Sequence, residues 1–207
     1  MAGVWRGLFA IVGFATLALQ YWLHFIGRGE LTVVEQTINY FSYFTILTNI
    51  LTASLMALPV LARDRTIGRW AASAGVRSAV TMFILVVGLA YHFLLAATWN
   101  PQGLLYPVNI VLHYVMPAAM LIDWLAFTPK GRLRWIDPVK WLAFPLVYGV
   151  WTVIHGFISG WWPYWFINVD ELGWSRAGAG YFGLLAFFLV MGMILVGADR
   201  MMGARDG

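Results

Sequence analysis

The stretch Pro107-Val-Asn-Ile-Val-Leu-His-Tyr-Val-Met-Pro117 decides how the rest of the chain is interpreted. It opens a long apolar segment with a proline and places Asn109 and His113 four residues apart. At that spacing the two side chains share one face of a helix. A histidine within an apolar membrane span is costly to bury in lipid. We therefore expect His113 to have polar partners at the same depth.

The composition surrounding this stretch is that of a membrane protein. Of 207 residues, 61% are hydrophobic and only 11% are charged, whereas soluble domains carry about 25% charged residues. The absence of cysteine excludes disulfides, thiolate metal sites and cysteine nucleophiles. The chain has a net charge of +4. In a membrane protein such positive charge collects in the cytoplasmic loops and does not indicate nucleic-acid binding, so we expect membrane lipids and no nucleic acid as partners.

Six segments are long enough to cross a bilayer, which takes about 20 apolar residues. They are residues 4–26, 38–61, 75–97, 107–127, 138–159 and 178–197. The sequence therefore predicts one domain, residues 1–207, folded as an all-α bundle of six transmembrane helices. No polar stretch is long enough to build a soluble domain.

The basic residues predict the orientation of the bundle. Only Arg28 and Arg176 fall on one side of the alternating spans. The other side holds eleven: Arg6, Arg63, Arg65, Arg69, Arg77, Lys130, Arg132, Arg134, Lys140, Arg200 and Arg205. Basic residues collect in cytoplasmic loops. We therefore expect both termini to be cytoplasmic and the protein to be integral to the cell (inner) membrane.

The polar residues of the spans gather in the outer half of the membrane. At about 1.5 Å per residue, Thr45, His113 and His92 lie roughly 8–10 Å below the outer edge. His155 lies roughly 6 Å in, and His24 only about 3 Å. The ordinary alternative is that an interfacial histidine is simply amphipathic, and this alternative is strongest for His24.

This layer contains the side chains needed for nucleophilic acyl transfer. A threonine hydroxyl becomes nucleophilic when an imidazole removes its proton. Amide N–H groups such as that of Asn49, one turn along from Thr45, suit a developing oxyanion. The alternative for Thr45, Thr48 and Thr52 is a hydrogen bond to their own helix backbone.

Three motifs occur in order along the chain: Tyr43-Phe-Thr-Ile-Leu-Thr-Asn49, Asn109-Ile-Val-Leu-His-Tyr-Val-Met-Pro117 and His155-Gly-Phe-Ile-Ser-Gly-Trp-Trp-Pro-Tyr164. Together they resemble the androgen-induced family of integral membrane proteins. Animal members of that family hydrolyse fatty acid esters of hydroxy fatty acids with a membrane-embedded threonine and a histidine. The resemblance implies that Thr45 is the nucleophile, His113 the matching histidine and His155 a further motif position.

The sequence thus predicts an intramembrane threonine hydrolase that takes lipid esters from the bilayer, with no metal or cofactor. Thr45 attacks the ester carbonyl, and His113 acts first as base and then as acid. Further candidates to orient His113 or bind the oxyanion are Asn49, Asn109, His155 and His92. The alternative is a non-enzymatic protein that binds haem or a metal through His92, His113 and His155.

No carboxylate on a span clearly completes a triad with the predicted base. Asp123 lies about 15 Å beyond His113 along the helix, toward the cytoplasmic end. Asp170, Glu171 and Glu35 fall in outer segments that could fold inward. The sequence leaves the substrate and the oligomeric state open.

A lipid ester needs a cavity that opens toward the outer leaflet, and the sequence contains residues suited to one. We expect the cavity to be mostly apolar with a few convergent polar groups. Gly88, Ala90 and Gly156 would leave room near the histidines. Within this cavity we expect Thr45 to reach His113 directly, at about 2.6–3.2 Å, or through one water.

Overall fold

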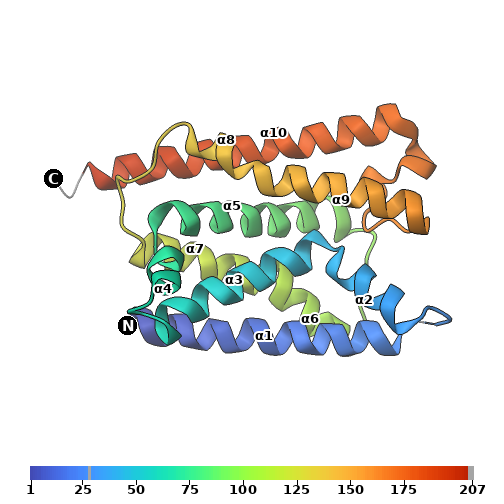
Figure 1. Cartoon of the computed structure of the whole chain (residues 1–207), viewed down its shortest axis with the longest axis horizontal. Coiled ribbons are helices and arrows are strands. Elements are labelled where there is room, and N and C mark those ends of the chain that lie inside the picture. Colours follow the sequence, from blue (N-terminus) through green and yellow to red (C-terminus); the bar gives the residue numbers. More distant parts are fainter. Residues whose placement is uncertain (28, 205–207) are drawn as a thin grey trace.

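The computed structural model of the chain describes residues 1–27 and 29–204 (Figure 1). All regular elements within these ranges are helical, and six helices there are long and apolar enough to cross a membrane. The prediction of an all-α bundle of six membrane-spanning helices is confirmed, and the chain is an integral, multi-pass membrane protein. Arg28 and Arg205, two of the residues used to orient the spans, lie outside the described residues.

Several spans are built from consecutive helical segments. The spanning segments are α1 (Ala2–Ile26), α3 (Phe44–Leu61), α5 (Ala74–Ala90), η1 (Tyr91–Leu95), α6 (Leu105–Ile110), η2 (Val111–Val115), α7 (Met116–Phe127), α8 (Asp137–Trp141), α9 (Ala143–Ser159) and α10 (Val169–Gly203). Shorter helices connect them: α2 (Val33–Phe41), α4 (Thr66–Ala71) and η3 (Trp165–Ile167). The first, third, fourth and fifth spans begin and end within two residues of the predicted positions.

The bundle has two distinct ends. The start of α1, the short helix α4 and the last turns of α10 lie at one end, which we call the terminal end (Figure 1). Helix α2, the start of α6 and the segment between α9 and α10 lie at the opposite end. Helix α1 packs on α3, α3 packs on α5, and α5 packs on both α7 and α10. The bundle is therefore continuous from α1 to α10.

The second span is shorter than the predicted 38–61. Helix α3 begins at Phe44, because Tyr43 is extended (φ −82°, ψ 126°) and interrupts the helix. The residues before it form the separate helix α2, which starts with a reciprocal Thr32–Glu35 capping box. Aromatic residues continue through the break, at Tyr40, Phe41, Tyr43 and Phe44, so the sequence prediction joined the two helices into one span.

The sixth span is longer than the predicted 178–197. Helix α10 covers Val169–Gly203, with a non-helical residue at Gly173 (φ 72°, ψ 163°). The side chain of Asn168 caps its start by accepting hydrogen bonds from the backbone N–H groups of Asp170 and Glu171. The helical segment therefore extends past the apolar run at both ends, and Gly173 kinks it near its start.

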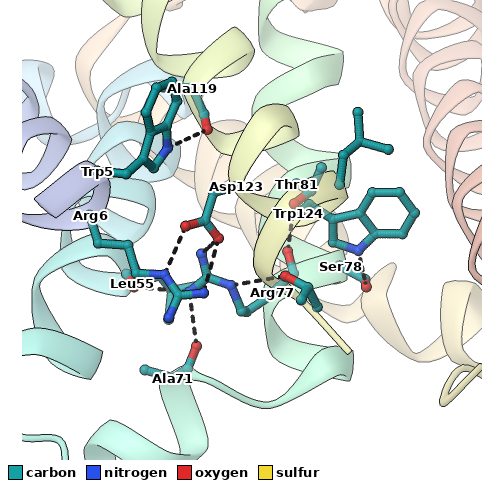
Figure 2. A network of polar contacts seen from close by, with 12 residues as sticks. Trp5, Arg6, Leu55, Ala71, Arg77, Ser78, Thr81, Ala119, Asp123 and Trp124 are labelled. Carbon is teal, nitrogen blue, oxygen red and sulfur yellow. Dashed lines mark hydrogen bonds and ion pairs between the residues drawn. The ribbon is translucent and has the colours of Figure 1, made fainter. Parts of the chain in front are cut away.

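Inside the terminal end lies a network of charged side chains that we call the salt-bridged triad: Arg6, Arg77 and Asp123 (Figure 2). Arg77 and Asp123 are both 0% exposed and form an ion pair. Arg6 Nε donates to Asp123 Oδ1 at 2.8 Å. Arg77 also donates to Thr128 Oγ1 at 3.2 Å and to the Leu55 carbonyl at 3.1 Å. Arg77, grouped with the loop cations in the orientation prediction, is therefore an interior residue that joins α5 to α3 and α7.

Candidate functional site

A cavity of about 610 Å³ lies at the end of the bundle opposite the triad. Its wall is formed by α1, α2, α3, the two spans that contain η1 and η2, and residues 161–164. Thr45, His113 and Asn109 all line it. Other polar side chains in the wall are Gln20, His24, Gln36, Asn39, Tyr40, Tyr43, Tyr91, Thr98 and Tyr164. The structure thus brings the two predicted catalytic residues to one cavity.

Thr45 differs from the other threonines of α3. Its Oγ1 lies 3.3 Å from the Tyr164 hydroxyl, and its backbone N–H donates to the same hydroxyl at 3.3 Å. Thr48 and Thr52 each donate instead to a carbonyl one turn back in the helix, at 2.8 Å. The backbone-bonded alternative therefore holds for Thr48 and Thr52, while the Thr45 hydroxyl bonds to another side chain.

The position of Thr45 in its helix also differs from the prediction. Because α3 begins at Phe44, Thr45 is its second residue and lies in the first turn, not about 10 Å into the span. The first N–H groups of a helix have no intrahelical acceptor, and the helix dipole is positive there. This location favours a negative charge that develops next to Thr45.

Tyr164 reaches Thr45 from the loop that follows α9. Burial raises the pKa of the Tyr164 phenol above its ordinary value. The phenol is therefore protonated at neutral pH and keeps an O–H that can donate to an oxygen near Thr45. Tyr164 ends the third sequence motif, but no role at the site was predicted for it.

The imidazole of His113 is held in one orientation by its own helix. Nδ1 lies 3.0 Å from the Asn109 carbonyl oxygen, in the π-helical segment η2. Because a carbonyl only accepts, Nδ1 carries the proton and Nε2 keeps its lone pair. The ring stacks on Tyr91 with centroids 4.0 Å apart. An oriented imidazole with a free Nε2 lone pair is what a general base requires.

The two asparagines act on the position of His113. Asn109 donates from Nδ2 to the Tyr91 hydroxyl at 2.6 Å, so it orients both the ring that stacks on His113 and, through its carbonyl, His113 itself. Asn49 donates from Nδ2 to the carbonyls of Thr45, at 2.9 Å, and Leu112, at 3.2 Å. These bonds occupy the Asn49 N–H groups, so Asn49 joins α3 to η2 and does not supply an oxyanion donor.

The hydrogen bonds described for Thr45 and His113 do not join the two residues to each other. Thr45 pairs with Tyr164, Asn49 and Thr48, and His113 pairs with Asn109. The predicted direct contact at about 2.6–3.2 Å is therefore not formed in this structure. A proton that moves between them passes through a molecule in the cavity that both line.

The other two histidine candidates lie outside this cavity. His92 is exposed, and its Nδ1 lies 3.2 Å from the hydroxyl of Tyr114, which is also exposed. His155 is buried and stacks on Trp151, with ring centroids 5.6 Å apart and planes 7° apart. Within the described residues, no group of three or more His, Cys, Asp or Glu side chains is placed to hold a metal ion. The three histidines of the ligand alternative are therefore not brought together.

The candidate carboxylates are engaged elsewhere. Asp123 belongs to the salt-bridged triad at the terminal end. Asp170 accepts a hydrogen bond from Trp162 Nε1 at 2.7 Å, and Glu35 accepts from Thr32 in the capping box. None of these carboxylates lines the cavity. The carbonyl of Asn109 stands where a carboxylate would orient the imidazole in a triad.

The small residues expected to leave room near the histidines pack closely instead. A Cβ at Gly88 would lie 2.8 Å from the His113 carbonyl oxygen, and one at Gly156 would lie 2.5 Å from the Trp162 ring. These glycines allow close approach of neighbouring segments and create no space. Ala90 lines a second, smaller pocket on the other side of Thr45.

Comparison with models of protein families, with curated proteins and with solved structures finds no match. The likeness to the androgen-induced family therefore rests on the three sequence motifs. The function has to be argued from the chemistry of the cavity.

Proposed function

We propose that the protein is an intramembrane hydrolase of lipid esters, with Thr45 as nucleophile and His113 as general base. The observation that supports this proposal most is that both side chains line one cavity of about 610 Å³, from α3 and from η2. The Thr45 hydroxyl, which bonds to Tyr164 and not to its own helix, and the oriented His113 ring add to it. The motif resemblance implies the same pair of residues.

The reaction begins with an ester carbonyl placed between the two residues. His113 Nε2 takes up the proton of Thr45 Oγ1 through one water molecule in the cavity while Oγ1 forms a bond to the carbonyl carbon, and the carbonyl oxygen takes up the electron pair. The Tyr164 O–H and the positive first turn of α3 stabilise that oxyanion. When the C–O bond to the alcohol breaks, the leaving alkoxide takes the proton from His113.

The second half of the reaction releases the acid. Water attacks the acyl-threonine ester, and His113 removes its proton as the second tetrahedral intermediate forms. Collapse of that intermediate breaks the bond to Thr45 Oγ1, which recovers a proton from His113. The products are a carboxylic acid and an alcohol, and no metal or cofactor takes part in these steps.

A fluorophosphonate probe tests the assignment of the nucleophile. We expect the purified protein to be labelled and the label to map to Thr45 by peptide mass spectrometry. Thr45→Ala should remove labelling and ester hydrolysis together, while the matched variant Thr48→Ala keeps both. A label on Thr48 would move the nucleophile by one turn. An unlabelled protein that hydrolyses no lipid ester, or one with a Soret band in its visible spectrum, would reject the proposal.

We also propose that the protein is integral to the cell (inner) membrane, with both termini in the cytoplasm. Basic residues at the terminal end support this orientation. Reporter fusions at Gly207 and in the segment of residues 63–72 should both give a cytoplasmic signal. An external signal from either fusion would invert the topology and place the cavity on the cytoplasmic side.

A further inference from the structure

A second pocket lies directly behind Thr45, between α3, α5, α9, η3 and α10. Its volume is about 60 Å³, against about 610 Å³ for the cavity. Four residues line both spaces: Thr45, Tyr91, Leu95 and Tyr164. The proposed nucleophile therefore stands in the partition between a small pocket and a large cavity.

The wall of the small pocket offers almost no free polar atom. The Tyr148 hydroxyl donates to the Ser42 carbonyl at 2.9 Å, and the Tyr181 hydroxyl donates to the Pro145 carbonyl at 2.8 Å. The Tyr91 hydroxyl accepts from Asn109. Only Thr45 and Tyr164, at the partition, present polar atoms near the proposed reaction. The rest of the wall is aromatic ring and aliphatic side chain, which favours an apolar occupant.

An aromatic cluster forms part of the wall of the small pocket. The Phe44 ring packs on Tyr148 with centroids 4.9 Å apart and on Phe188 with centroids 5.5 Å apart. All three residues belong to the buried core. A volume of about 60 Å³ corresponds to about two water molecules, each of which occupies about 30 Å³ in the liquid. A methylene is about as large as a water molecule, so the pocket has room for a chain of about two to three carbons.

We propose that this pocket binds the acyl chain of the substrate, and that it limits the protein to esters of short acyl chains with large alcohols. The inference rests on the proposed function. When an ester carbonyl is bonded to Thr45, its acyl chain and its alcohol extend in different directions from that carbon. The small apolar pocket takes the acyl chain, and the cavity, with its amides, imidazoles and phenols, takes a large amphipathic alcohol.

Two esters with the same molecular formula test which side of the ester enters the small pocket. Hexadecyl butanoate and butyl hexadecanoate have the same formula, and the ester runs in opposite directions in the two molecules. With the full chain in detergent micelles, we expect kcat/KM for hexadecyl butanoate to be at least about 10-fold higher, because methylenes without space in a pocket are strongly rejected. Release of butanoic or hexadecanoic acid is measured by mass spectrometry.

The outcomes separate this inference from the proposed function. Equal rates, or a preference for butyl hexadecanoate, overturn the acyl pocket while Thr45-dependent hydrolysis leaves the proposed function intact. Hydrolysis of neither ester also overturns the inference. The proposed function falls with it only if the fluorophosphonate probe fails to label Thr45 as well.

Variants in the pocket should shift chain-length preference in opposite directions. Ala90→Phe fills the pocket and should lower the ratio of butanoate to acetate hydrolysis by about 10-fold. Val87→Ala enlarges it and should raise the ratio of octanoate to butanoate hydrolysis. Val147→Ala is the matched control, because Val147 is 69% exposed and lies outside the pocket. Ratios that are unchanged in Val87→Ala, or changed equally in Val147→Ala, contradict the inference.

Discussion

The two ends of the bundle treat their polar side chains in opposite ways. At the terminal end, the salt-bridged triad pairs opposite charges inside the protein. The N–H groups of Arg77 donate to Asp123, Thr128 and backbone carbonyls. At the opposite end, none of the described residues that line the cavity is Asp, Glu, Lys or Arg. A network of paired charges stabilises the fold, whereas uncharged polar side chains that line a cavity can contact a ligand.

The largest expected effect falls on the cavity. Thr45→Ala should lower kcat/KM for ester hydrolysis by at least about 1,000-fold, and His113→Ala should cost a similar amount. The double variant should be little worse than either single variant, because a nucleophile and its base act as one unit. Initial rates with the purified variants measure this. Losses that multiply in the double variant would show that the two residues act independently.

Thr45→Ser is the companion to these variants, because it keeps a hydroxyl and removes a methyl group. We expect it to retain measurable hydrolysis and probe labelling. A fully inactive Thr45→Ser with an active Thr45→Ala would contradict the role of the hydroxyl.

At the terminal end, the expected effect is on stability. Asp123→Ala leaves Arg77 buried without its counter-charge, which should cost about 3–5 kcal/mol in the free energy of unfolding. The folded fraction should keep its rate of hydrolysis, because Asp123 does not line the cavity. Unfolding in denaturant, followed by far-UV circular dichroism, measures the first quantity and initial rates measure the second.

A matched control for Asp123→Ala is Lys140→Met, which removes an exposed ion pair to Asp137. Exposed pairs contribute about 0–1 kcal/mol, so its stability should barely change. If Asp123→Ala were stable but inactive, the terminal end would belong to the functional site and the comparison between the two ends would fail.

A smaller effect is expected where α5 approaches the backbone of His113. Gly88→Ala places a Cβ 2.8 Å from the His113 carbonyl oxygen, so η2 must move. A displacement of about 1 Å in a catalytic group costs up to about 100-fold in rate, and we expect kcat to fall by about 10-fold to 100-fold. Gly183→Ala is the control, since a Cβ there meets no atom within 4 Å. Equal rates in the two variants would show that His113 need not be held in place.

The smallest effect is expected for Thr48→Ala. It removes a hydroxyl that donates to the Phe44 and Thr45 carbonyls, an interaction worth about 1 kcal/mol of stability. Hydrolysis should stay within about threefold of the unsubstituted protein. A large loss of rate together with normal stability would transfer the role of nucleophile from Thr45 to Thr48.

The number and approximate length of the spans followed from the sequence by itself, because apolar length is a local property of the chain. Four of the six spans begin and end within two residues of their predicted positions. That Thr45 and His113 line one cavity agrees with the prediction from motif spacing and depth, but the predicted direct contact between them is not formed. For Thr45 the depth was wrong, because an extended Tyr43 starts α3 six residues later than the apolar run suggested.

Only the tertiary structure decided how each helix is rotated and which distant residues meet. Tyr164 contacts Thr45 across 119 positions of the chain, and Arg77 turns inward to Asp123 while His92 turns outward. In a helix that is apolar on every face, hydropathy carries no signal for rotation about its axis. That rotation is set by packing between helices and by the pairing of buried polar groups, which involve residues far apart in the sequence.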